Sequence, residues 1–221
     1  MSVPLPAPAE LERLLYTAVL SDVLDSFGLM HQALRPFVRP LDDSLTMFGR
    51  ARTGRYVPVT RASSDNPYEL EMDLIDGLRP GEVAVLACDG PTDVIAPWGE
   101  LLSTAARARQ AAGCLTDGLV RDVGRIRAMR FPVFHGGIGP LDTRGRAEMV
   151  EKDAPVQIAG VSVAPGDWIL GDVDGVVVIP AAQADAVFRA ALDKIAAEDT
   201  TRAELEAGDT LRAVFARHGV L

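Results

Sequence analysis

The sequence predicts an α/β protein built around a mixed β-sheet. Apolar residues at helical spacing fill both ends of the chain, and short apolar runs bounded by turn residues fill its middle. The two kinds of segment alternate irregularly, which favours a sandwich around a mixed sheet over a regular doubly wound fold. Because the 221 residues are 48% hydrophobic and 24% charged, we expect one globular domain over residues 1–221.

The first half of the chain begins with helical spacing and continues with strands. Within the first helical segment, Ser21 is a candidate N-cap of a second helix, and Gly28 is a stop signal. Residues 63–67, Ser-Ser-Asp-Asn-Pro, form a loop and helix-start signal. The pattern therefore predicts a helical segment, a loop, a strand, a helix and a buried strand at 10–27, 31–45, 48–59, 68–78 and 82–88.

The second half of the chain alternates more quickly. We expect a helix from about Gly99, a strand that ends at Thr116 and a turn at Asp117-Gly118. Residues 181–221 are rich in Ala, Glu and Arg and predict a helical extension, split in two near Gly208-Asp209. Between these parts we expect a helix, a strand, a long flexible loop and several short strands at 123–129, 131–134, 136–145 and 150–180.

Charge and hydropathy exclude several classes of function. The net charge is −9, and because an acidic surface repels phosphate backbones, we expect no nucleic-acid partner. No apolar run approaches the roughly 20 residues that a membrane span requires. The N-terminal residues Met-Ser-Val-Pro lack the basic and apolar regions of a signal peptide. These features predict a soluble cytoplasmic protein without a membrane partner.

The few cysteine and histidine residues restrict the metal chemistry. Cys88 and Cys114 are far apart and are expected to be buried, reduced thiols. The three histidines show no metal-binding spacing. A metal ion in this protein would therefore be held by oxygen ligands, which favours Mg²⁺ or Mn²⁺ over zinc.

The segment from Gly99 to Leu102 is a candidate anion-binding site. Apolar spacing places a helix start at about Gly99, and the first amides of a helix lack intrahelical partners and carry positive partial charge. Glycine permits a carboxylate to approach these amides closely. The segment therefore predicts a backbone cradle formed by Gly99, Glu100, Leu101 and Leu102. The alternative is an ordinary helix start with glycine in a tight turn.

Arg121 and Asp122 follow the predicted strand and turn, where sites gather in α/β folds. Arginine offers a planar fork to a carboxylate, and Asp122 is a hard oxygen ligand suited to magnesium. Twenty residues separate Glu100 from Arg121. Glu100 adds a carboxylate that either coordinates a metal, directly or through water, or complements the helix dipole. A surface ion pair and a helix N-cap remain alternatives for Arg121 and Asp122.

Five other positions are weaker candidates. Asp117 is either a further polar group of the site or a turn residue, and its Asp-Gly context favours the turn. Asp172 and Asp174 resemble a metal-binding pair by count, but their Gly-Asp-Val-Asp-Gly context favours turn formation. His135 precedes two glycines and is either a residue that reaches the site or a structural residue at a strand end, and the structural role is favoured. We interpret Trp98 as a packing anchor beside the site. The sequence contains no P-loop, no GxGxxG motif and no Ser-His-Asp order.

Several motifs together resemble the RraA-like family, which includes the 4-hydroxy-4-methyl-2-oxoglutarate / 4-carboxy-4-hydroxy-2-oxoadipate aldolases. They occur in family order and cover most of residues 15–185, which we take as the core. They are Asp22-Val-Leu-Asp-Ser-Phe-Gly28, Gly99-Glu-Leu-Leu102, Thr116-Asp-Gly-Leu-Val-Arg-Asp122, Phe131-Pro-Val-Phe134, Gly145-Arg146, Pro165-Gly-Asp167 and Gly171-Asp-Val-Asp-Gly-Val-Val-Val-Ile-Pro180.

The resemblance implies a divalent-metal-dependent class II pyruvate aldolase with oxaloacetate decarboxylase side activity. It also implies a layered α-β-β-α sandwich of the swivelling-domain type, assembled as a homotrimer or homohexamer with active sites at subunit interfaces. By resemblance, residues 99–102 form the substrate cradle, Arg121 binds substrate and Asp122 binds the metal. Glu100, Arg121 and Asp122 are the implied catalytic residues.

Two departures from the family pattern bear on function. Active aldolases of this family typically have Asp at the position of Glu100, whereas the regulator of RNase E activity has Gly there. Glu100 keeps the carboxylate but changes its reach. The regulator pattern expects an acidic residue shortly after the Arg-Asp pair, where this chain has Arg125. These departures favour an enzyme, and a non-enzymatic regulator of RNase E activity is the alternative.

Overall fold

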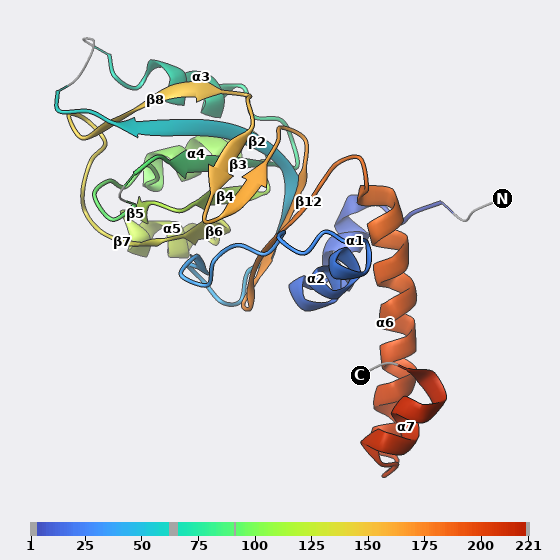
Figure 1. The fold of residues 1–221 in the computed structure, drawn as a ribbon. Helices are drawn as coiled ribbons and strands as arrows, with labels where there is room; N and C mark the ends of the chain where they lie inside the picture. Colours follow the sequence, from blue (N-terminus) through green and yellow to red (C-terminus); the bar gives the residue numbers. More distant parts are fainter. Residues whose placement is uncertain (1–3, 62–65, 91, 220–221) are drawn as a thin grey trace.

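A mixed β-sheet forms the centre of the molecule in the computed structural model, which describes residues 4–61, 66–90 and 92–219 (Figure 1). Among these residues the sheet has eight strands in the order β1-β6-β4-β3-β2-β11-β12, with β8 also paired to β2. The strands of this sheet are β1 (Arg39–Pro40), β2 (Met47–Pro58), β3 (Glu82–Cys88), β4 (Gly113–Thr116), β6 (Val133–His135), β8 (Ala147–Lys152), β11 (Trp168–Asp172) and β12 (Gly175–Ile179).

The strands β2, β3, β4 and β6 are mutually parallel, whereas β1, β8, β11 and β12 pair antiparallel. The central strand β3 is buried on both faces: Val83, Val85 and Ala87 point to one side, and Ala84 and Leu86 to the other. Continuous apolar strands of this kind are typical of parallel sheets covered on both faces. The carboxyl ends of the parallel strands meet at one edge, where ligand sites form in such folds.

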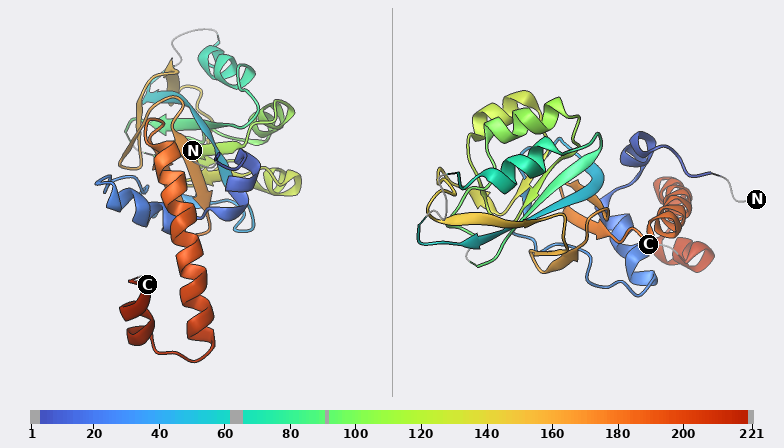
Figure 2. Two further views of the ribbon diagram at one scale, coloured as in Figure 1. Left: turned by 90° about the vertical axis from the view of Figure 1, so that its right-hand side faces the viewer. Right: turned by 90° about the horizontal axis from the view of Figure 1, so that it is seen from above.

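Three helices cover one face of the sheet, namely α3 (Glu69–Asp76), α4 (Glu100–Ala108) and α5 (Val123–Met129). The opposite face is covered by a hairpin of β9 (Val156–Ile158) and β10 (Val161–Val163). Figure 2 shows the three helices on one side of the sheet and the hairpin on the other. A third small sheet pairs β5 (Leu119–Val120) with β7 (Gly137–Ile138) in parallel.

The terminal helices pack at the β11–β12 end of the sheet. Residues of α1 (Pro8–Leu14), α2 (Thr17–Ser26) and α6 (Ala184–Glu206) share an apolar cluster with these strands. In this cluster the Phe48 and Trp168 rings are stacked, and Phe188 packs edge-to-face against both. The far half of α6 and helix α7 (Leu211–His218) project away from the sheet (Figures 1 and 2).

The α/β class, the mixed sheet and the two C-terminal helices are confirmed. Three local predictions are wrong. The predicted loop at 31–45 contains β1, which forms because β6 offers it an antiparallel partner. Ser21 is not a cap, because it lies inside α2 and the helical segment instead breaks at Leu15 and Tyr16, which are extended. The predicted flexible loop at 136–145 contains β7, which forms because β5 offers it a parallel partner.

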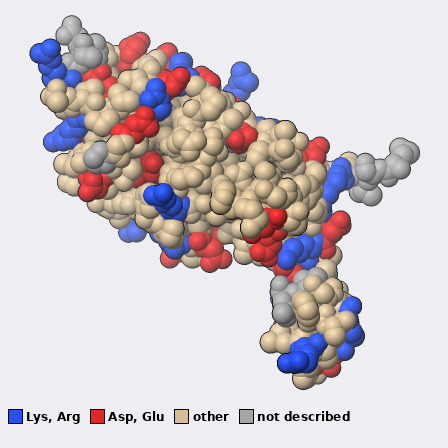
Figure 3. Space-filling view, viewed as in Figure 1, with Lys and Arg blue, Asp and Glu red and all other residues tan. Residues whose placement is uncertain are grey.

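Acidic and basic side chains are interspersed over the face of the molecule in Figure 3. Among the described residues, no helix is both long enough and apolar enough to span a bilayer. Part of the predicted helix-start signal at 63–67 lies outside the described residues, since the description resumes at Asn66.

Candidate functional site

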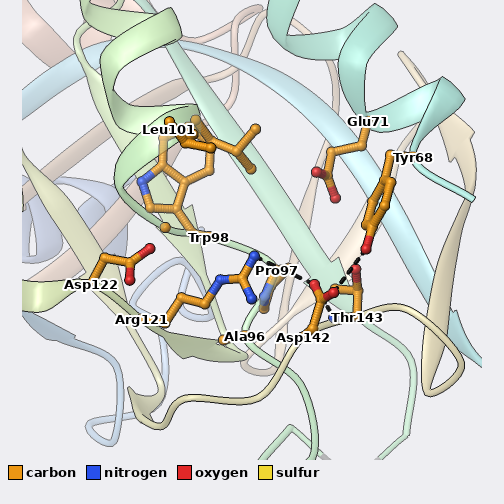
Figure 4. Close-up of a pocket in the computed structure, with 12 residues that line it drawn as sticks. Tyr68, Glu71, Ala96, Pro97, Trp98, Leu101, Arg121, Asp122, Asp142 and Thr143 are labelled. Atoms are coloured by element: carbon orange, nitrogen blue, oxygen red, sulfur yellow. Dashed lines mark hydrogen bonds and ion pairs between the residues drawn. The ribbon is translucent and has the colours of Figure 1, made fainter.

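A cavity of about 150 Å³ lies at the carboxyl ends of the parallel strands. Its lining comes from the start of α3, the loop before α4, the start of α4, the residues after β5 and the loop after β7 (Figure 4). The residues that line it are Tyr68, Glu71, Ala96, Pro97, Trp98, Gly99, Leu101, Leu102, Arg121, Asp122, Asp142 and Thr143. Five of the six residues predicted for the site therefore share one cavity.

The first wall of the cavity is the start of α4. Gly99 is the N-cap residue, and the first turn is fixed when the Ser103 amide donates to the Gly99 carbonyl at 3.1 Å. Trp98, which is fully buried, donates from Nε1 to the Ser103 hydroxyl at 2.7 Å and anchors this turn from below. A Cβ atom added at Gly99 would lie 2.9 Å from Asp122 Oδ2. The glycine therefore permits the close approach of this carboxylate to the helix start.

Arg121 and Asp122 reach the cavity because the chain after β5 is tied to the loop before α4. Trp98 and Val120 form a parallel bridge, and the Arg121 amide donates to the Trp98 carbonyl at 3.0 Å. Asp122 has a left-handed backbone (φ 58°), an uncommon conformation that aspartate tolerates better than most residues. Its Oδ2 accepts the Glu100 amide at 3.2 Å. The helix start therefore already binds a carboxylate of the protein.

The second wall places an acidic group beside the arginine. Asp142 Oδ1 lies 3.4 Å from Arg121 Nη2, and its Oδ2 accepts the Tyr68 hydroxyl at 2.8 Å. Figure 4 shows Tyr68 and Arg121 approaching Asp142 from opposite sides. Burial, followed by the bond to Asp142, raises the pKa of Tyr68 above its usual value. Because Arg121 and Asp142 are both partly exposed, an anionic ligand can compete with Asp142 for the guanidinium.

Glu71 is the most deeply buried carboxyl group of the cavity lining, with 8% of the residue exposed. It accepts a short hydrogen bond on Oε2 from the hydroxyl of Tyr56, which is fully buried on β2. Burial raises the pKa of Glu71. The phenol and Arg121 lower it, and Asp142 raises it further. Glu71 is therefore a carboxyl group whose protonated form is favoured relative to an exposed glutamate.

Glu100 lies beside the cavity, but its side chain does not line it. The Glu100 carboxylate accepts the Thr104 hydroxyl at 3.0 Å, one turn along α4. Among the described residues, no group of three or more His, Cys, Asp or Glu side chains could enclose a metal ion. A lone carboxylate such as Asp122 still suits Mg²⁺, since this ion keeps several waters and often binds through one or two carboxylates plus the substrate.

The weaker candidates have structural surroundings. Asp172 accepts the Thr17 amide at 2.8 Å and the Asp174 amide at 2.9 Å, which confirms its role in a turn. Asp117 is buried and accepts the amides of Cys88 and Ala159. His135 is buried away from the cavity lining, and burial lowers its pKa. Both cysteines are buried and free, as expected.

Tyr68, Glu71 and Asp142 line the cavity but are not among the residues predicted for the site. A signal for Glu71 exists: it shares its helix face with the buried Leu74 and Ile75, and a carboxylate at that spacing is unusual. Asp142 has no comparable local signal, because it comes from a loop whose position depends on the pairing of β5 with β7.

Comparisons with known proteins agree with this architecture. The family model described as "RraA-like: Aldolase/RraA" matches residues 17–178. Protein DlpA of Legionella pneumophila is 30% identical over 195 residues, which are 88% of this chain but only 31% of that protein. This chain thus spans about a third of the length of DlpA. A protein of Halalkalibacterium halodurans, provisionally named 4-hydroxy-4-methyl-2-oxoglutarate aldolase, is 33% identical over 92% of this chain and 90% of its own length.

A solved structure gives the same result for the fold. Streptomyces coelicolor RraAS2, described as an unusual member of the RNase ES inhibitor RraA protein family, superposes with a TM-score of 0.77. It is 26% identical, and the match covers 90% of this chain and 99% of that one. The family model covers well over half of the chain, and its span includes the whole cavity lining. The chain belongs to the RraA-like family.

Proposed function

We propose that this protein is a carbon–carbon lyase that cleaves a 4-hydroxy-2-oxo acid to pyruvate and a second oxo compound. One observation carries the proposal: Arg121, Asp122 and the start of α4 line the same cavity. A guanidinium, a metal-binding carboxylate and helix-start amides together are suited to a small oxo-acid. The provisional aldolase name of the Halalkalibacterium halodurans relative supports the same reaction class.

Residues of this chain would bind the carboxylate and the keto oxygen of the substrate. The amides at the start of α4, residues 99–102, would hold the substrate carboxylate. At the Glu100 amide it would take the place of the Asp122 carboxylate, which that amide binds in this structure. Arg121 would bind the keto oxygen or the carboxylate in place of its contact with Asp142. The reacting bond would then lie inside the cavity.

A divalent metal, Mg²⁺ or Mn²⁺, belongs to this proposal. Asp122 would hold it, with Glu100 as an additional ligand either directly or through water. A bound divalent metal supplies Lewis-acid polarisation of the keto group. Since the Glu100 side chain is bonded to Thr104, its participation requires a change of rotamer.

The reaction breaks the C3–C4 bond of the substrate. The C4 hydroxyl loses its proton, C4 becomes a carbonyl carbon, and the electron pair of the broken bond remains as the enolate of pyruvate. Arg121 stabilises the charge that develops on the enolate oxygen, because its guanidinium is already oriented in the cavity. The same enolate chemistry makes oxaloacetate decarboxylation an expected side activity.

A coupled assay of pyruvate release tests the proposal. A panel of 4-hydroxy-2-oxo acids and oxaloacetate is assayed with Mg²⁺ and with EDTA. We expect release of pyruvate with Mg²⁺ and none with EDTA. The ratio of the rates on the 4-hydroxy-2-oxo acids and on oxaloacetate separates an aldolase from a decarboxylase. Absence of pyruvate from every substrate would contradict the proposal.

Assembly is part of the proposal. We expect a homotrimer or homohexamer with sites at subunit interfaces, because apolar residues are exposed at the cavity rim. Leu101, which lines the cavity, is 77% exposed, and Ile138, which lines a neighbouring groove together with Arg121 and Asp122, is 59% exposed. A patch of this kind is typical of an interface. Light scattering of the protein in solution measures the assembly.

A second candidate function is inhibition of an RNase E-type ribonuclease, as described for the RraA family of the Streptomyces coelicolor neighbour. Binding of such a ribonuclease, together with the absence of metal-dependent pyruvate release, would favour this function. Cleavage of RNA in the presence of the protein measures it directly.

A further inference from the structure

Glu71 faces the reaction cavity from α3, on the side opposite the start of α4. It lines the cavity together with Arg121, Asp122 and Asp142, and Figure 4 shows its carboxyl group directed into this space. Glu71 is 8% exposed, and a carboxyl group is rarely buried to this extent without a specific partner. Its position requires an explanation that packing alone does not give.

The partners of Glu71 leave one of its oxygens available. Among the described residues, this carboxyl group accepts one hydrogen bond, from the Tyr56 hydroxyl to Oε2. Tyr56 is fully buried and comes from strand β2, so the phenol holds the carboxyl group from behind. Arg121 and Asp142 act on Glu71 through their charges rather than through direct bonds. Oε1 is therefore free to exchange a proton with a ligand.

The proposed reaction requires such a group. Cleavage removes a proton from the C4 hydroxyl and later adds one to C3, and both atoms lie on the part of the substrate remote from the carboxylate cradle. Arg121 cannot accept a proton, because a guanidinium stays charged in proteins. Asp142 already accepts two hydrogen bonds, from Tyr68 and from the Thr143 amide, in addition to its ion pair.

We propose that Glu71 is the proton-transfer residue of this site, an inference that rests on the proposed lyase function. The Glu71 carboxylate accepts the C4 hydroxyl proton as the C3–C4 bond breaks, and the electron pair of that bond remains on the enolate. The resulting carboxylic acid then returns the same proton to C3, which gives the methyl group of pyruvate. Protons and electrons balance without another reactant.

The charges and burial around Glu71 suit both proton transfers, from the C4 hydroxyl to Glu71 and from Glu71 to C3. Burial raises the pKa of Glu71 above that of an exposed glutamate, whereas the Tyr56 hydroxyl and Arg121 favour the carboxylate. The other ionisable groups of the cavity lining are Tyr68, Asp122 and Asp142. A general acid–base group transfers protons most efficiently when its pKa lies near the working pH, and a raised carboxyl pKa moves in that direction.

Exchange of the pyruvate methyl protons with D₂O isolates the proton transfer from bond cleavage. Proton NMR follows this exchange in the presence of Mg²⁺ for the wild type and for Glu71→Gln. We expect the variant to lose exchange and pyruvate release by about 100-fold or more, the lower range of general acid–base effects. Glu69→Gln is the matched control, because Glu69 lies exposed on the same helix. It should retain the wild-type rate.

Binding of oxalate, a planar mimic of the pyruvate enolate, separates proton transfer from substrate binding. We expect Glu71→Gln to bind oxalate within about threefold of the wild type, because the substitution keeps the shape of the side chain. Exchange that stays within about tenfold of the wild type would overturn the inference, and so would a parallel loss of oxalate binding. A wild type without pyruvate release or exchange would overturn the proposed function itself.

Tyr56→Phe provides an independent test. We treat Tyr56 as a positioning residue, because it acts on the substrate only through Glu71. Loss of the phenol removes a bond that favours the carboxylate, so the acid limb of the cleavage pH profile should move to higher pH. An acid limb that stays in place would contradict the role assigned to Glu71, even if the turnover falls.

Discussion

Glu71 and Asp117 are both buried carboxyl groups, but their surroundings differ. Asp117 is 5% exposed and accepts the Cys88 amide at 2.9 Å and the Ala159 amide at 3.2 Å, which ties the end of β3 to the β9–β10 turn. Glu71 lines the cavity and accepts one bond from a phenol. Burial raises the pKa of both. Burial and pKa direction therefore do not distinguish a framework acid from a candidate reactive one, whereas the identity of the hydrogen-bond donors does.

Removal of the framework acid should have the largest effect on stability. In Asp117→Ala, two buried backbone amides lose their acceptor, and each unsatisfied group costs about 1–3 kcal/mol. We expect the free energy of unfolding to fall by about 2–5 kcal/mol. Urea denaturation measures this change. A loss below about 1 kcal/mol would show that water or a shifted side chain replaces the carboxylate.

The pH dependence of stability should identify the buried charge of Glu71. Burial raises the pKa of Glu71 in the folded state above the ordinary value of 4.5. At pH values between these two pKa values, the folded state therefore holds a proton that the unfolded state has released. The resulting stabilisation is complete below that ordinary value and is lost as pH rises through the raised pKa. We expect the wild type to lose stability relative to Glu71→Gln over this window, by at most about 1.4 kcal/mol per pH unit.

The measurement is a series of urea denaturations of the wild type and Glu71→Gln from acidic to neutral pH. The contribution of Asp117 cancels in this comparison, since both proteins contain it. A constant difference between the two proteins across the series would mean that Glu71 titrates alike in the folded and unfolded states.

Gly99→Ala should have the smallest effect on stability. The new Cβ would lie 2.9 Å from Asp122 Oδ2. This oxygen ends the short Asp122 side chain, which is able to rotate away. The backbone at Gly99 is extended, so alanine is not strained there. We expect a change in unfolding free energy below about 1 kcal/mol. Pyruvate release should nevertheless fall, because Asp122 leaves its position at the helix start. Unchanged activity would argue against a role for that position.

The wall of the cavity that the sequence predicts is formed by residues close together in the chain. The cradle and the Arg121–Asp122 pair lie within one continuous segment, where a helix start follows a loop and a strand end precedes a turn. Local patterns of this kind are readable without a structure. The roles assigned to these residues remain predictions.

The other wall depends on tertiary contacts. Asp142 reaches Arg121 because β7 pairs with β5, and nothing in the local sequence of that loop indicates the pairing. The break of the first helical segment was also misplaced, because the Thr17 hydroxyl and amide bind Asp172, far away in the sequence. Glu71 differs from both cases, because its place on an apolar helix face is a local feature of the sequence.

The most direct test of the central claim is pyruvate release by Arg121→Ala compared with the wild type. Loss of a charge-stabilising donor from an enclosed site costs about 3–4 kcal/mol, so kcat should fall by about a hundredfold or more on every substrate that the wild type cleaves. The release by the wild type should also disappear in EDTA. Near-full turnover by Arg121→Ala on these substrates would contradict the account.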